Sequence, residues 1–429
     1  MGVELSIPPD IQDFLGKVRA FRLSLPERID GAERAGRFPP KLLRECGKLG
    51  LCGMLVPKEY GGSDIGPLGY VLAIEELSRA SASLGVVLSV HNSVGVFPVY
   101  QFGTEEQRRE FLPRLCSGEA LAAFALTEAG AGSDVSSIST TAVRDGDCWL
   151  LNGIKLFISN GEGEIVNVLA STKREKGNSG QTMFIVRKGD KGFRIGSTER
   201  KMGIHADQTC ELVFEDCHIP ADRLLGKENE GFKQAMQVLD TGRIGISAQA
   251  IGSTEGALDY AIDAVKRGGI AMASSTGPPP SSRSSPGRPG PQPGEEWEEA
   301  NFVRRHPHRR VEESRANCMA SDLAQSQTVQ FALAECATDI EAARLLILSA
   351  ADRKQRGMST TMAASMAKLQ AASAANRVAK RLVEILGPEA VQGQNPIERF
   401  FRDAKVFEIY EGTSEIHQLI ISRRLLGSL

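Results

Sequence analysis

The chain has 429 residues, with 51 Lys and Arg against 53 Asp and Glu and a formal net charge of −2. This length allows a large buried core and predicts two or three domains. The balanced charge argues against a general nucleic-acid-binding protein, which would carry a basic excess.

The cysteines and histidines do not indicate a metal centre. The eight cysteines form no CxxC pair and have no metal-site spacing, so we expect reduced thiols. The six histidines form no HExxH motif. The sequence therefore predicts no metal site.

No apolar run approaches the ~20 uninterrupted residues of a membrane span. The run from Leu84 to Tyr100 is broken by His91 and Asn92, which favours a buried helix. The opening residues, MGVELSIPPD, lack the pattern of a targeting segment. We expect a protein without membrane association, in a bacterial cytoplasm or as a mature protein of the mitochondrial matrix.

Residues 1–121 predict a helical domain, because apolar residues recur at helical spacing throughout. The expected helices are marked by Phe14, Val18 and Phe21 on one face, by Pro39-Pro40 at a helix start, and by the runs Leu72–Ala82 and 105–118.

Residues 122–231 predict a compact β domain. Short β-prone runs are separated by Gly, Asp and Asn, at residues 140–145, 148–153, 166–171, 182–187 and 210–220. Asp145-Gly146 and Asn152-Gly153 are typical of hairpin turns.

Residues 232–429 return to helical periodicity and predict a C-terminal bundle. Long helices are expected at Phe232–Val265, Val329–Arg356 and Thr361–Leu386, followed by a final pair. Residues 268–326, rich in Pro, Ser, Gly and Arg, interrupt this pattern and predict a disordered linker. An arm for nucleic acid or membrane is the less favoured alternative.

A short loop between the final two helices carries Glu411. Gly412 allows a tight turn there, and Thr413 or Ser414 can cap the second helix. A carboxylate held beside Tyr410 and other apolar neighbours would be partly desolvated, which raises its pKa and suits a general base. Taken alone, the pattern more often marks an ordinary capping acid.

A Gly-rich turn follows an apolar run at residues 124–134, FALTEAGAGSD. Such a turn exposes several backbone N–H groups that can bind phosphate or the edge of a flavin. It is not a GxGxxG motif, so a structural turn is the simpler interpretation. Likewise Arg243, in LDTGRIG, is by itself more often a buried ion-pair partner than a substrate residue.

These stretches resemble the signatures of acyl-CoA dehydrogenases. The similarity is carried by RDAKVFEIYEGTSEIHQLIISR (402–423), by residues 124–134, by LDTGRIG, and by the order of N-terminal helical motifs. It covers residues 1–267 and 327–429. The resemblance implies an α+β protein with the acyl-CoA dehydrogenase fold: a helical domain, a β domain and a C-terminal four-helix bundle.

The resemblance also implies roles for individual residues. Glu411 would be the catalytic base, because some relatives carry the base immediately before Arg243, where this chain has Gly242. FAD would contact Phe124, Leu126, Thr127, Gly132, Ser133, Phe157, Ile158, Ser159, Arg267, Gln327, Gly387, Thr413 and Glu415. The acyl-CoA would contact Ser133, Asp240, Arg243, Tyr410 and Gly412.

The implied reaction is α,β-dehydrogenation of a short or short-branched acyl-CoA, since LDTGRIG resembles the short-chain branch. Glu411 would remove the α-proton and the flavin would accept the β-hydride, with electrons passed on to an electron-transferring flavoprotein. A homotetramer is implied as well. The alternatives are an inactive homologue or an oxidase of the same fold.

The chain departs from the family pattern in two places. After Arg267, about sixty unrelated residues replace a short segment that reaches the FAD of a neighbouring subunit in the family. Leu386-Gly387-Pro388 replaces the usual Leu-Gly-Gly, and Pro388 removes a backbone N–H.

Overall fold

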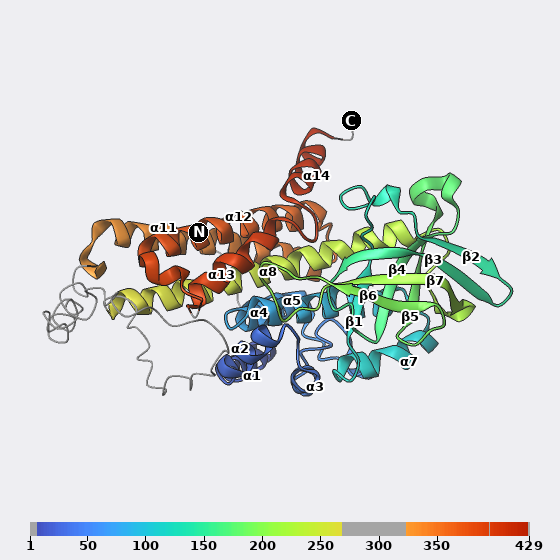
Figure 1. Ribbon diagram of the computed structural model, residues 1–429, viewed down its shortest axis with the longest axis horizontal. Coiled ribbons are helices and arrows are strands. Elements are labelled where there is room, and N and C mark those ends of the chain that lie inside the picture. Colours follow the sequence, from blue (N-terminus) through green and yellow to red (C-terminus); the bar gives the residue numbers. More distant parts are fainter. Residues whose placement is uncertain (1–6, 268–322, 394, 428–429) are drawn as a thin grey trace, which may run out of the picture.

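The computed structural model describes residues 7–267, 323–393 and 395–427. A β-sheet lies at one end of the molecule, and a long helical bundle extends away from it (Figure 1). The predicted disordered linker lies outside the described residues, except for its last four residues, 323–326.

The N-terminal part is helical, as its periodicity predicts. Its helices are α1 (Pro9–Leu23), α2 (Pro26–Ala35), α3 (Pro40–Lys48), α4 (Gly66–Ser78), α5 (Ala82–Val90), α6 (Phe97–Phe102) and α7 (Glu105–Cys116). The helix expected over Leu72–Ala82 ends earlier, at Ser78, because Ser81 starts a new helix. The Ser81 hydroxyl accepts a hydrogen bond from the Leu84 N–H at 3.2 Å and caps α5.

The apolar stretch Ala82–Phe102 is helical throughout, with a π-helical turn at His91–Val96. By length and composition it could cross a membrane, but 94% of its most apolar window is buried inside the protein. The Asn92 side chain accepts from the Met54 N–H at 2.9 Å, which satisfies its carbonyl oxygen in the core. The prediction of a buried helix is confirmed.

The sheet has eight strands: β1 (Ala122–Ala125), β2 (Thr141–Asp145), β3 (Cys148–Ile158), β4 (Ile165–Ser171), β5 (Gln181–Arg187), β6 (Phe193–Thr198), β7 (Cys210–Pro220) and β8 (Leu224–Leu225). Their order is β6-β7-β3-β2-β4-β5-β8, and β1 pairs in parallel with β4. At the start of β1, the Ala122 N–H donates to the His91 side chain at 3.1 Å, which ties the sheet to the N-terminal helices.

One predicted hairpin is confirmed and the other is wrong. Asp145 pairs with Cys148, so Gly146 lies in a two-residue turn between β2 and β3. Asn152-Gly153 instead lies within β3, at a shift of register against β7. Asn152 pairs with Thr141 of β2 and Gly153 pairs with Phe214 of β7, so strand pairing on both sides of β3 continues through this dipeptide.

The C-terminal helices are α8 (Gly231–Lys266), α11 (Gln327–Gln355), α12 (Thr361–Leu386), α13 (Pro396–Ala404) and α14 (Ser414–Leu426). The long helices α8, α11 and α12 pack along one another, and α14 projects from the bundle (Figure 1). The buried face of α12 is rich in alanine, including Ala364, Ala367, Ala371 and Ala375. These small side chains let α8 and α11 approach closely, which brings distant parts of the chain to one site.

Candidate active site

Glu411 lies in the loop between α13 and α14, after a short turn at Lys405–Glu408. Both Glu411 (φ 54°) and Gly412 (φ 104°) adopt left-handed backbone conformations. Such a conformation is unfavourable for a glutamate and is concentrated at functional sites. Thr413 ends the loop by accepting the Ile416 N–H at 3.4 Å, which confirms one of the two predicted caps.

The Glu411 carboxylate faces Gly242 on α8. A Cβ atom added at Gly242 would lie 2.6 Å from Oε2 and 2.9 Å from Oε1 of Glu411. Only glycine leaves space for the carboxylate at this position. The two alternative positions for a base, one on α8 and one after α13, are therefore neighbours in space although 169 residues separate them.

The environment of Glu411 suits proton transfer near neutral pH. Its Oε2 atom is buried and has no hydrogen-bond partner among the described residues. Burial raises the pKa of Glu411 to about 7, while the nearby charges of Arg243 and Lys368 act in the opposite direction. An unpartnered, desolvated carboxylate with such a pKa is typical of a general base.

Arg243 and Asp240 form a buried ion pair, with Nη1 2.9 Å from Oδ1. The Thr361 hydroxyl donates to the other Asp240 oxygen at 2.6 Å. Arg243 also donates through Nε to the Glu411 carbonyl oxygen at 3.4 Å. The pairing that sequence reasoning left open for Arg243 is thus present, and the same side chain reaches the loop that carries Glu411.

Tyr410 points into the protein, where its hydroxyl donates to the Gln249 side chain at 2.5 Å. Gln249 in turn donates to the Ala82 carbonyl oxygen at 2.6 Å. Gly242 and Gln249 lie seven residues apart on α8 and therefore share a face. Glu411, Gly242, Tyr410 and Gln249 thus follow one line along the helix.

Sequence reasoning missed four residues at this site. They are Lys368 on α12, which donates to the Gly412 carbonyl oxygen at 2.7 Å, together with Tyr70, Gln249 and the buried His417. A lysine within the apolar stripe of α12 was the one available signal, because charge is rare on such a face.

The Gly-rich stretch lies beside the end of β3, close to the predicted FAD contacts Phe157, Ile158 and Ser159. The Leu156 N–H donates to the Thr127 carbonyl oxygen at 2.9 Å. The fully buried Lys155 donates to the Leu126 carbonyl oxygen at 2.9 Å and to Glu128 at 2.8 Å. These bonds hold Leu126 and Thr127, just after β1, against residues 155–156 of β3, while Phe124 pairs with Asn167 of β4.

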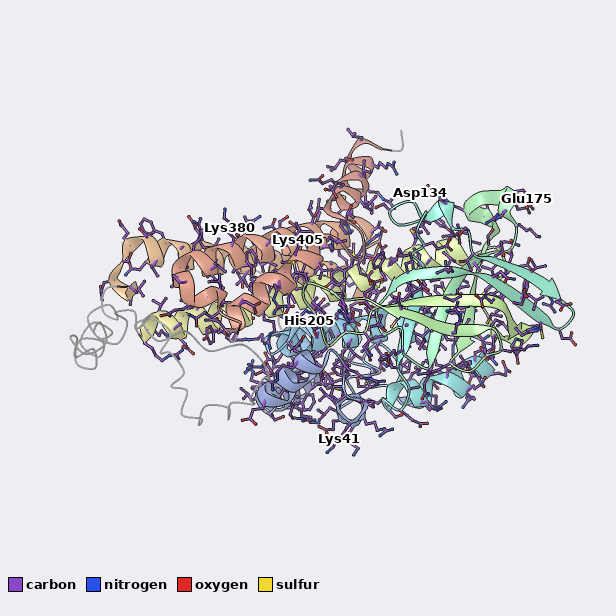
Figure 2. All side chains as sticks on the ribbon, in the orientation of Figure 1. Lys41, Asp134, Glu175, His205, Lys380 and Lys405 are labelled. Atoms are coloured by element: carbon purple, nitrogen blue, oxygen red, sulfur yellow. The ribbon has the colours of Figure 1, made fainter. Side chains whose placement is uncertain are left out.

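The other predicted flavin residues of the sheet differ in exposure. Phe157 is left-handed (φ 58°) and 62% exposed, and Gly132 and Ser133 are also exposed. Ile158 is buried, and the Ser159 hydroxyl donates to Asp207 at 2.8 Å. Figure 2 shows Asp134, the last residue of the Gly-rich stretch, at the edge of the sheet domain.

Three predicted cofactor residues lie far from Glu411 within one chain. Arg267 and Gln327 flank the undescribed segment, and Gly387 follows α12, at the end of the bundle away from the sheet. Arg267 is 25 residues beyond Gly242, about 37 Å at about 1.5 Å per residue. By contrast, Thr413 and Glu415 flank the start of α14, next to Glu411.

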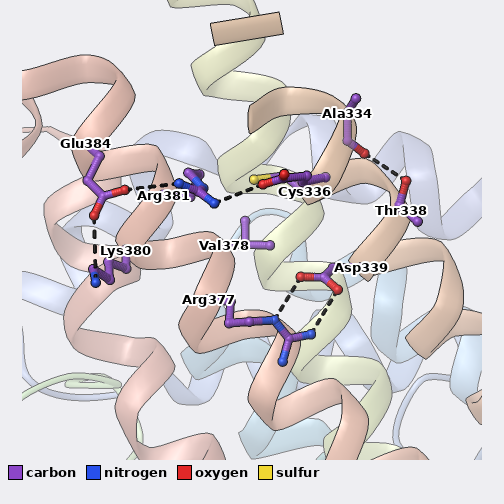
Figure 3. Close-up of a pocket in the computed structure, with 10 residues that line it drawn as sticks. Ala334, Cys336, Thr338, Asp339, Arg377, Val378, Lys380, Arg381 and Glu384 are labelled. Carbon is purple, nitrogen blue, oxygen red and sulfur yellow. Dashed lines mark hydrogen bonds and ion pairs between the residues drawn. The ribbon is translucent and has the colours of Figure 1, made fainter. Parts of the chain in front are cut away.

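A groove between α11 and α12 is a poor alternative site (Figure 3). Arg377 donates to both oxygens of Asp339, at 2.8 and 3.0 Å, and Arg381 donates to Glu335 at 2.9 Å. Each arginine is paired with a carboxylate on the facing helix, and Lys380 lies 3.8 Å from Glu384, so the described charges that line the groove are paired with one another. Among the described residues, no three His, Cys, Asp or Glu side chains converge as metal ligands.

Known family models match most of the chain. The acyl-CoA dehydrogenase N-terminal, middle and C-terminal domain models match residues 8–119, 123–217 and 309–426. An acyl-CoA dehydrogenase of Bacillus subtilis is 41% identical, covering 97% of this chain and 96% of its own. The chain belongs to the acyl-CoA dehydrogenase family.

Two further similar proteins are short-chain members of the family. The mouse mitochondrial short-chain specific acyl-CoA dehydrogenase is 38% identical over 92% of this chain and 85% of its own. The structure of butyryl-CoA dehydrogenase from Megasphaera elsdenii superposes with a TM-score of 0.83 at 36% identity, covering 99% and 100% of the two chains. The expected fold is confirmed, and the chain is an enzyme of a family of FAD-dependent oxidoreductases that act on CH–CH bonds.

The described residues fit the flavin that this family uses. Phe157 presents an exposed aromatic ring beside the half-buried Thr127. A Cβ added at Gly130 or Gly132 would meet no atom within 4 Å, so the space over this loop is open. An exposed ring next to an open, Gly-rich backbone can accept a planar cofactor and its phosphates.

Proposed function

We propose that the chain binds FAD and converts a short or short-branched acyl-CoA to the trans-2-enoyl-CoA, with Glu411 as the base. The observation that carries this proposal is the position of Glu411: a buried carboxylate oxygen without a partner, held against Gly242 by a left-handed loop. Burying an unpartnered carboxylate costs free energy, and such groups are concentrated at functional sites.

In this mechanism, Glu411 takes the α-proton of the substrate at its unpartnered carboxylate oxygen. FAD, when bound beside Thr127 and Phe157, supplies the acceptor for the β-hydride. The Glu411 backbone N–H would bind the thioester oxygen, which stabilises the developing negative charge. Burial of the site excludes water and strengthens both interactions. Ser133, Asp240, Arg243, Tyr410 and Gly412 would position the acyl-CoA.

The close packing of α8 on α4 supports a short acyl chain. A Cβ added at Gly245 would overlap the Tyr70 hydroxyl, and one at Gly252 would overlap the Glu75 carbonyl oxygen. At Gly252, beyond the Gln249–Tyr410 pair, the two helices therefore meet backbone to backbone, and at Gly245 the Tyr70 side chain reaches the surface of α8. An acyl chain that extends along α8 from Glu411 would meet this contact after a short distance, so the space available favours a short chain.

We further propose that reduced flavin passes its electrons to an electron-transferring flavoprotein. In a homotetramer, Arg267, Gln327 and Gly387 would act on the FAD of a neighbouring subunit, because they lie too far from Glu411 in their own chain. The division into residues 1–121, 122–231 and 232–429, and a location in a bacterial cytoplasm or the mitochondrial matrix, are part of the same proposal.

The visible spectrum of the purified protein, before and after anaerobic addition of butyryl-CoA, tests the proposal. We expect a flavin band that bleaches. A band that persists would contradict the substrate, and no band after addition of FAD would favour an inactive homologue. Fast reoxidation in air would favour an oxidase.

The activity should depend on pH through Glu411. Only the ionised carboxylate accepts the α-proton, and burial raises its pKa to about 7. We therefore expect kcat/KM for butyryl-CoA to rise with pH and level off above about 7. The measurement is the rate of anaerobic flavin reduction between about pH 5.5 and about pH 9, a range that covers both sides of this pKa. A flat profile would contradict Glu411 as the base.

Gln249→Ala should extend the range of acyl chains. The substitution removes a fully buried side chain that lies between Glu411 and the close contact of α8 with α4 at Gly252. We expect the kcat/KM ratio of hexanoyl-CoA to butyryl-CoA to rise about tenfold, since each methylene accommodated in an apolar pocket is worth about 1–3 kcal/mol. Gln234→Ala, at a buried position nearer the start of α8, is the control and should leave the ratio unchanged.

A further inference from the structure

Two buried cations hold the loop that carries Glu411, and they come from different helices. Arg243 of α8 donates to the Glu411 carbonyl oxygen at 3.4 Å, and Lys368 of α12 donates to the next carbonyl oxygen, that of Gly412, at 2.7 Å. Both carbonyls belong to residues with left-handed backbone. The shorter bond is the one made by Lys368.

The environment of Lys368 is unusual for a lysine. Its side chain is 1% exposed, and no carboxylate lies within 4.0 Å of its ammonium among the described residues. Arg243, by comparison, is already paired with Asp240 at 2.9 Å. Burying an ammonium without a paired carboxylate is costly, and its one hydrogen bond to the protein described here is to the loop of the base.

We propose that Lys368 is a positioning residue for the catalytic base: its ammonium fixes the Gly412 carbonyl, and through it the left-handed backbone that directs the Glu411 carboxylate at Gly242. The inference rests on Glu411 being the base. A purely structural lysine that fills space in the bundle is the competing interpretation.

The charge of Lys368 also acts on Glu411. Burial raises the pKa of Glu411 to about 7, and Arg243 and Lys368 both hold it down. In the described part of the chain, the other titratable groups that interact with Glu411 or Lys368 add no positive charge. Burial keeps Tyr70, Tyr410 and His417 neutral, while Glu408 and Glu415 interact with Lys368 from the loop and α14. Removing the lysine charge should therefore favour protonated Glu411 and move its titration to higher pH.

The test compares Lys368→Met with Lys380→Met in the flavin-loaded protein. Lys380 lies on the same helix (Figure 2), where its side chain is exposed and lies 3.8 Å from Glu384. For Lys368→Met we expect an intact flavin band, KM for butyryl-CoA within about threefold of wild type, and kcat lower by about 10- to 100-fold. The midpoint of the pH profile should rise by about one unit. Lys380→Met should match wild type in all of these.

Wild-type kcat, or a lower kcat with an unshifted midpoint, would show a merely structural role and overturn the inference. If Lys368→Met does not fold, Lys368→Gln decides, because it keeps a donor for the Gly412 carbonyl and removes the charge. It should raise the midpoint with a smaller loss of kcat, and an unshifted midpoint would again overturn the inference. Turnover retained by Glu411→Gln would instead contradict the proposed function itself.

Discussion

Glu411→Gln is expected to lower turnover of butyryl-CoA by at least about a thousandfold while the protein still binds FAD and acyl-CoA. The amide has nearly the same shape as the carboxylate, but it cannot accept the α-proton. The left-handed loop and the space beside Gly242 remain. Anaerobic stopped-flow reduction of the flavin would measure the loss, and an unchanged KM would show that binding survives.

Glu398→Gln is the matched control. Glu398 is a partly buried glutamate of α13, paired with Arg402 at 2.6 Å and 13 residues before Glu411 in the chain. It should keep turnover within about twofold of wild type, as expected for an ion pair near the surface. Loss of turnover in both variants, or in neither, would contradict the assignment of the base.

A relocated base gives an independent check. Because a Cβ at Gly242 would lie 2.6 Å from the Glu411 carboxylate, Gly242→Glu combined with Glu411→Gly places a carboxylate in the same space. We expect the turnover of this double variant to be at least about tenfold higher than that of Glu411→Gly alone. No recovery, with flavin bound, would mean that the loop rather than the carboxylate governs the reaction.

Lys155→Met is expected to destabilise the sheet domain by about 3–5 kcal/mol. Lys155 and Glu128 form an ion pair at 2.8 Å with side chains only 0% and 3% exposed. Burial by itself would raise the pKa of Glu128, but Lys155 and hydrogen bonds from Ser139 and Thr140 hold it at about 2. Removing the lysine leaves a buried carboxylate without its counter-ion. Urea denaturation followed by fluorescence of Trp149, on the same strand as Lys155, would measure the loss.

The same pair should matter for the cofactor, because Lys155 also holds the Leu126 carbonyl oxygen at 2.9 Å. We expect Lys155→Met to bind FAD more weakly. Lys173→Met, at a half-exposed position 3.9 Å from Glu228, is the control and should change stability by less than about 0.5 kcal/mol. Equal stability of the two variants would contradict the inferred role of the buried pair.

Low pH should weaken the sheet domain through the same carboxylate. The folded-state pKa of Glu128 lies below its usual value, so its stabilising contribution is complete above the unfolded pKa. The contribution is lost as pH falls from about 4.5 towards about 2. In Glu128→Gln this part of the pH dependence should be absent from urea denaturation curves.

The sequence by itself determined the features that depend on neighbours along the chain. Helical periodicity predicted α8, α11 and α12 to within a few residues, Asp145-Gly146 predicted the β2–β3 turn, and the break before Thr413 placed Glu411 in a loop. These features follow from local backbone preferences and from apolar residues spaced a few positions apart. Resemblance to a family added the role of Glu411.

Only the tertiary structure decided which distant residues meet. The contact of Glu411 with Gly242 and the bond from Lys368 to Gly412 depend on how α8 and α12 pack. Asn152-Gly153 failed as a predicted turn because β7, distant in the sequence, pairs with Gly153 and continues the strand. Local patterns do not encode such pairs, since packing, burial and charge at these positions exist only once the bundle and sheet have formed.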